Sequence, residues 1–80
     1  MVNLKHSNVF RIRLSQRELE ILQLICLGNT INSIANKLYL SPHTIASHKK
    51  KLVLKFKAKN IVHLGVLAER KGYLCGVELE

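Results

Sequence analysis

The sequence contains no aspartate and only five acidic residues in all, so carboxylate groups are scarce. Glu18 and Glu20 stand two residues apart, and on a helix such side chains point to different sides. They cannot act together as a general acid and base. No glycine-rich phosphate loop follows a strand pattern, and no serine or cysteine nucleophile has an evident base. We therefore expect a protein without catalytic residues and without a cofactor.

Proline and glycine are also scarce, with one and four residues, while 48% of the chain is hydrophobic. This balance favours an ordered helical chain over a disordered or sheet-rich one. A chain of 80 residues makes one domain. A domain so small buries only about 60% of its unfolded surface, so dimerisation would help to stabilise it.

The two cysteines, Cys26 and Cys75, lie far apart without the spacing of metal ligands. We interpret them as buried or incidental thiols in a reducing compartment and predict no metal site. Residues 1–13 lack the apolar run of a signal peptide, and no stretch approaches the ~20 apolar residues of a membrane span. The sequence predicts a cytoplasmic protein that does not enter a membrane.

Positive charge dominates the chain, with a net charge of +8 that indicates an anionic partner, nucleic acid ahead of a membrane surface. No acidic residue lies between Glu20 and Glu69. A short segment there collects most of the lysines: Lys49, Lys50, Lys51, Lys55, Lys57 and Lys59. A lysine run is often only a solvated face. However, neighbouring lysines without acidic partners repel one another, so stability alone does not explain this run.

Four helices are expected. The first covers residues 14–27, where Ser15 and Glu18 form a capping box and Gly28 ends the helix. Its core-facing stripe is Leu19, Leu22, Ile25 and Cys26. Thr30 caps a shorter second helix, whose stripe is Ile31, Ile34, Ala35 and Leu38.

Only Tyr39 and Leu40 separate the second helix from the next cap, Ser41, and so short a link forces two helices to cross steeply, as in a helix-turn-helix. Pro42 opens the third helix, about residues 42–55. Its packing side is Ile45, Leu52 and Phe56, and its other faces carry His43, Ser47, Lys50, Lys51 and Leu54. A DNA major groove admits a basic helix of this kind.

The last helix, residues 61–71, is capped by Asn60 and stopped by Gly72. It is apolar over a wide arc: Ile61, Val62, Leu64, Val66, Leu67 and Ala68. This arc favours either a helix that meets a partner or a buried terminal helix. We expect Tyr73 and Leu74 to fold back on it.

Several motifs occur in one order: LSQRELEIL in the first helix, IANKL in the second, LSPHTI at the turn, and then His48, Leu52 and Lys55. In this pattern the chain resembles the LuxR-type (GerE-type) helix-turn-helix domain of bacterial transcription regulators over residues 14–74. Residues 1–13 are then a tail or linker and residues 75–80 a C-terminal tail. The resemblance implies an all-α, compact four-helix bundle without a wing.

The same resemblance implies a role for each matching position. The third helix would enter the major groove, with base contacts from Ala46, Ser47 and Lys50. Phosphate contacts would come from Thr30, Asn32, Thr44, Lys51 and Asn60, and we add Lys49, whose ammonium is expected to reach solvent or a phosphate. The last helix would mediate dimerisation through Val62, Val66, Leu67 and Arg70. Such domains often follow a receiver or sensor domain and act with RNA polymerase.

The chain departs from the family pattern at several positions. Ala46 stands where the family often has Lys or Arg, so only a methyl group is left to meet a thymine methyl. Ile31 and Ser33 remove the capping box of the second helix, and Ile61 replaces a usual Arg. His48 is interpreted as a structural, hydrogen-bonded group rather than a pH sensor, and His63 as a surface residue.

Two alternatives stay open beside a dimeric DNA-binding regulator. A degenerate helix-turn-helix that serves as a protein-interaction module would explain Ala46, Ile31 and Ile61. It would not explain the lysines on the third helix. The promoter-reading region of sigma factors shares a similar helix-turn-helix, although His48 and Lys55 favour the LuxR type.

Overall fold

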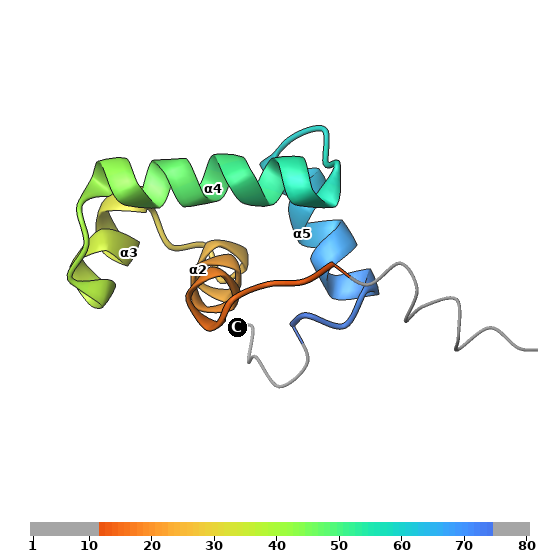
Figure 1. Ribbon diagram of the computed structural model, residues 1–80, viewed down its shortest axis with the longest axis horizontal. Coiled ribbons are helices and arrows are strands. Elements are labelled where there is room, and N and C mark those ends of the chain that lie inside the picture. The colour runs from red at the N-terminus through yellow and green to blue at the C-terminus, as the bar shows by residue number, and fades with distance from the viewer. Residues whose placement is uncertain (1–11, 75–80) are drawn as a thin grey trace, which may run out of the picture.

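The computed structural model describes residues 12–74, and within that range the chain is all-helical, which confirms the predicted fold class. The helices are α2 (Gln16–Cys26), α3 (Ile31–Leu38), α4 (Pro42–Phe56) and α5 (Ile61–Arg70). In Figure 1, α4 runs along one edge of the molecule, with α3 at its N-terminal end, α5 at its C-terminal end and α2 between them. Helix α4 contacts each of the other three helices, and its opposite side lies at the surface of the molecule.

Each helix begins at the cap that the sequence predicts. The Ser15 Oγ accepts from the Glu18 N–H at 3.1 Å, and the Glu18 Oε1 accepts from the Ser15 N–H at 2.9 Å, so the capping box is confirmed. Thr30, Ser41 and Asn60 each accept a backbone N–H three residues later. Four predicted helix limits shift by one or two residues. Helix α2 begins two residues later, because its cap Ser15 is extended, and ends one residue earlier, while α4 ends one residue later and α5 one residue earlier.

The helix ends hold a feature that the sequence did not indicate. Gly28 and Gly72 adopt positive φ angles of 92° and 85°, as predicted for residues that stop a helix. Tyr39 and Lys57 also have positive φ, at 57° and 55°, although neither is glycine. Tyr39 thereby turns the chain from α3 into α4.

The core lies where the four helices meet. Its buried side chains are Ile21, Leu22, Ile34, Ala35, Ile45, Leu52, Phe56, Leu64, Ala68 and Tyr73. The predicted packing side of α4 is confirmed in full. In α2 the predicted stripe was displaced: Ile21 was missed and is fully buried, whereas Leu19, Ile25 and Cys26 are only partly buried. The reason is that α2 lies between the other helices and packs on more than one side.

Both ends of the described chain close over this core. The Tyr73 ring meets Phe56 edge-on, with centroids 5.4 Å apart, and the Gln23 side chain donates to the Tyr73 carbonyl at 3.2 Å. The Tyr73 hydroxyl donates to the Ile12 carbonyl, and Ile12 itself packs against the core. Tyr73 and Leu74 were expected to fold back on the last helix. The Tyr73 N–H does donate to the Ala68 carbonyl of α5, but the Tyr73 ring and carbonyl meet α4 and α2, and its hydroxyl holds the chain before α2.

Candidate nucleic-acid interface

The outward face of α4 carries the three residues expected to reach bases, Ala46, Ser47 and Lys50, and all three are exposed. They alternate with Ile45 and Leu52, which are fully buried on the opposite face. This division follows from the helical period, because residues three and four apart share a side. The helix is therefore fixed from within, and its free side is the edge of the molecule seen in Figure 1.

Four of the six residues expected to contact phosphate lie near helix N-termini, where backbone N–H groups make a positive end. Thr30 and Asn60 are the exposed caps of α3 and α5, and Asn32 is exposed in the first turn of α3. Thr44 is half-buried, and its hydroxyl lies 2.9 Å from that of Ser41. Thr30 caps α3 without a reciprocal side chain at Ser33, which instead donates its hydroxyl to the Asn29 side chain.

Most lysines of the basic segment are free. Lys50, Lys51, Lys57 and Lys59 are exposed, and within residues 12–74 none of them takes part in an ion pair. Lys49 is half-buried, as expected for a lysine on the core side. Since no carboxylate of the described chain pairs with them, these lysines present a positive surface along α4 and the start of α5.

Lys55 is different, because its ammonium is bound within the domain. It donates to both carboxylate oxygens of Glu18, at 2.8 and 3.0 Å, and to the Arg13 carbonyl at 3.2 Å. The Lys55 hydrogen bond, with the Ser15 N–H, holds the pKa of Glu18 below its ordinary value of 4.5. Lys55 therefore joins α4 to the first turn of α2 rather than facing a ligand.

Two histidines depart from their expected roles. The Nδ1 of His48 is buried without a hydrogen-bond partner among residues 12–74, so the prediction of a hydrogen-bonded group is wrong for this atom. His63 is half-buried rather than a plain surface residue. Its ring Nδ1 accepts from the backbone N–H of Lys59 at 2.9 Å, while its backbone N–H donates to the Asn60 side-chain oxygen. His63 thus fixes the loop that carries Lys59 to the start of α5.

Helix α5 divides into a buried and an exposed side. Leu64 and Ala68 are fully buried, whereas Val62 and Val66 are 74% and 44% exposed. Arg70 is exposed, and Leu67 is half-buried against the core. The wide apolar arc is therefore not that of a helix buried on all sides.

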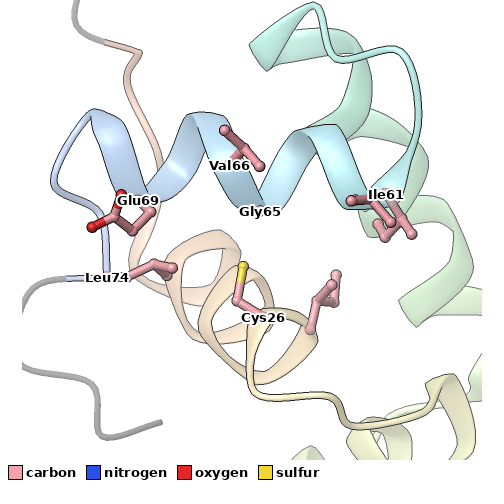
Figure 2. A pocket seen from close by; sticks show the side chains of 8 residues that line it. Cys26, Ile61, Gly65, Val66, Glu69 and Leu74 are labelled. Carbon is pink, nitrogen blue, oxygen red and sulfur yellow. The ribbon is translucent and has the colours of Figure 1, made fainter.

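A shallow apolar groove of about 510 Å³ adjoins this exposed side of α5. Figure 2 shows the thiol of Cys26 on α2 pointing toward α5 across it, with Gly65 opposite and Leu74 at one end. Cys26 is a free thiol whose partial burial raises its pKa. Cys75 lies outside the described residues. The groove is apolar and lacks a cluster of polar groups aimed into it, so it is not built like a catalytic pocket.

Comparison with known protein families identifies the family to which this helical domain belongs. The family described as bacterial regulatory proteins, luxR family, matches residues 13–68. This chain belongs to the luxR family. Its helix-turn-helix is accordingly that of a LuxR-type DNA-binding domain of transcription regulators, as the motifs predicted. The family is not a known class of enzymes.

Several curated proteins resemble this luxR-family domain. The uncharacterized transcriptional regulatory protein YvfU of Bacillus subtilis is 39% identical over 61 residues, which cover 76% of this chain and 30% of YvfU. The response regulator UvrY of Escherichia coli is 40% identical, over 81% of this chain and 29% of UvrY. The putative positive transcription regulator BvgA of Bordetella pertussis is 37% identical, over 85% and 32%.

The luxR-family chain thus spans about a third of the length of the curated relatives it matches. No solved structure matches it. Across residues 12–74, no three His, Cys, Asp or Glu side chains lie close enough to hold a metal ion. In the same range no helix has the length and apolar character needed to cross a membrane.

Proposed function

We propose that this domain binds double-stranded DNA by inserting α4 into the major groove, as the effector part of a transcription regulator. The observation that carries the proposal is the free side of α4: a small, a hydroxyl and a cationic residue stand in register on a helix whose other side is fully buried. A major groove about 12 Å wide accepts one such helix and presents hydrogen-bonding groups to it.

In this arrangement Ala46, Ser47 and Lys50 meet base edges, and Lys50 can donate to guanine O6 and N7. Ala46 offers only a methyl group, so discrimination depends chiefly on Ser47 and Lys50. Phosphate contacts fall to other residues of α4 and to the N-terminal ends of α3 and α5: Thr30, Asn32, Thr44, Lys49, Lys51 and Asn60. The caps Thr30 and Asn60 support this assignment, because each stands at a helix N-terminus, which favours an anion.

We further propose that two copies associate through the exposed side of α5, so that paired reading helices meet half-sites about one helical turn apart. Val62 and Val66 provide the apolar centre, with Arg70 beyond them. Leu67 packs mainly against the core of its own domain, so only its accessible part is available to a partner. An interface of this kind would cover apolar surface that the single domain leaves in water.

The whole regulator is proposed to work in the bacterial cytoplasm, where its DNA lies. UvrY is named a response regulator and is more than three times as long as the segment it shares with this chain. By analogy, a receiver or sensor domain would control this DNA-binding domain, and RNA polymerase would be the machinery that it influences.

Selection of bound sequences from random duplex DNA, at low and at high salt, tests the proposal directly. We expect an enriched motif with two-fold symmetry, and an affinity that falls steeply with salt, by a slope of about −0.9 for each phosphate contact. Binding without any motif would contradict the base contacts. Absence of binding even at low salt would favour an interaction module, for which the exposed valines of α5 would be the surface.

Two substitutions on α4 separate base contacts from phosphate contacts. Lys50→Ala is expected to relax base preference at one position of the motif, at a cost of about 1–3 kcal/mol on the best site. Lys51→Ala is expected to weaken all sequences about equally and to reduce the salt slope by about one. Identical changes in sequence preference for the two variants would refute this division of roles.

Dimerisation is tested by Val62→Lys, which places a charge at the most exposed apolar position of α5. We expect a lower mass by analytical ultracentrifugation and weaker binding to a two-half-site duplex, with the helical circular dichroism spectrum retained. Leu27→Lys is the matched control, because Leu27 is also exposed but caps the end of α2. Equal masses for both variants and the parent chain would show that this side of α5 is not an interface.

A further inference from the structure

Leu54 is an apolar side chain on the side of α4 that carries the proposed base contacts, Ser47 and Lys50, and 70% of it is exposed. It lies four residues after Lys50 and seven after Ser47, one and two helical turns further along the same side. The period that aligns the proposed base contacts therefore aligns Leu54 with them. Leu54 therefore continues the surface formed by Ser47 and Lys50 and is not part of the core.

The surroundings of Leu54 are cationic. Lys50 and Lys51 precede it by one helical turn, and Lys57 follows at the end of α4, all three exposed and without an ion pair in the described chain. Positive charge, which attracts the DNA backbone, therefore lies both before and after Leu54 along α4. The remaining large exposed apolar residues are on other elements: Leu27, Tyr39, Val62 and Val66. None of them lies on α4, so Leu54 is the one large apolar side chain exposed on this helix within the described residues.

An isobutyl group cannot hydrogen-bond to a base edge. The one apolar group that the major groove offers is the C5 methyl of thymine. We propose that Leu54 is a specificity-determining residue that packs on a thymine methyl and extends the half-site beyond the bases met by Ser47 and Lys50. This inference rests on the proposed insertion of α4 into the major groove.

The position of that thymine follows from helix geometry. Four residues advance about 6 Å along an α-helix, since each residue rises about 1.5 Å. Base pairs stack about 3.4 Å apart, so on a helix lying along the groove the thymine stands about two base pairs from the base that Lys50 contacts. Burial of one methyl group is expected to contribute about fourfold in affinity.

The experiment uses the 80-residue chain and its own selected motif. Each thymine of the motif is replaced in turn by deoxyuridine, which removes the C5 methyl and nothing else, and the dissociation constant is measured for each duplex. For the parent chain we expect one thymine in each half-site at which uracil weakens binding about fourfold. Leu54→Ala should bind the thymine and uracil duplexes equally at that position. Leu27→Ala, which removes the same side chain outside α4, should keep the fourfold ratio.

The outcomes separate this inference from the function on which it rests. A parent chain that selects no motif overturns the proposed function and Leu54 recognition together. A motif without a uracil-sensitive thymine overturns the role of Leu54 alone. The role of Leu54 is also overturned if Leu54→Ala keeps the fourfold ratio between the thymine and uracil duplexes, even where its affinity for both duplexes falls by the same factor. Thermal unfolding of each variant verifies that the fold is retained.

Discussion

Replacement of Lys55 by Met separates a structural lysine from the neighbouring lysines that are proposed to contact DNA. The substitution keeps most of the aliphatic stem and removes the ammonium that binds Glu18 and the Arg13 carbonyl. The Glu18 side chain is only 12% exposed, whereas that of Lys55 is 39% exposed. The variant thus leaves a largely covered carboxylate without its cation.

The magnitude follows from these exposures. Hydrogen bonds to charged groups contribute about 1.5–3 kcal/mol, while exposed ion pairs contribute about 0.2–1 kcal/mol. Because water still reaches the Lys55 ammonium, we expect a loss of about 1 kcal/mol. In a domain of this size such a loss lowers the thermal midpoint by about 4–8 °C. Lys51→Met, at an exposed lysine without an ion pair in the described chain, should stay within about 0.5 kcal/mol of the parent.

A double-mutant cycle with Glu18→Gln isolates the pair. Glutamine can still accept from the Ser15 N–H, so the cap survives while the charge is lost. Urea unfolding of the parent chain, both single variants and the double variant should give a coupling of about 1 kcal/mol near neutral pH. A coupling below about 0.3 kcal/mol would show that the contact contributes nothing to stability.

Acid provides a second check on the same pair. The pKa of Glu18 is lowered in the folded domain by Lys55 and the Ser15 N–H. A lowered pKa means that the pair stabilises the fold fully above the ordinary value of 4.5 and loses this effect as the pH falls through the folded value. The stability gap between the parent and Lys55→Met should therefore close in acid. A gap that is constant with pH, or a Lys55→Met variant that loses as much salt slope as Lys51→Met, would refute the assignment of Lys55 to structure.

Two further predictions concern the core and the groove. Leu52→Ala removes a fully buried side chain of α4 and should cost about 2–5 kcal/mol in urea unfolding, whereas Leu54→Ala on the exposed side should cost less than about 0.5 kcal/mol; similar losses would contradict the orientation of α4. In a Cys75→Ser chain, Cys26 should react with iodoacetamide more slowly in the native than in the denatured state, because burial raises its pKa and limits access. Equal rates in both states would place Cys26 in solvent.

Local interactions are the part of this molecule that its sequence predicted well. A cap and the N–H it accepts are three residues apart, so Ser15, Thr30, Ser41 and Asn60 could be assigned without knowledge of the fold. The buried side of α4 followed from the helical period alone. The set Ala46, Ser47 and Lys50 came instead from the resemblance to the LuxR-type family, and all three are exposed on α4.

The sequence itself determined four capped helices, a short turn and a basic third helix, because each depends on residues within a few positions of one another. Only the tertiary structure decided which lysines are free. Lys55 reads like its neighbours in the sequence, yet its partner Glu18 lies 37 residues earlier on another helix. Ile21 was likewise missed because α2 is covered on more than one side, and the Tyr73 hydroxyl reaches Ile12 across 61 residues. Burial and charge pairing between distant segments depend on how the helices pack, and no local pattern encodes that packing.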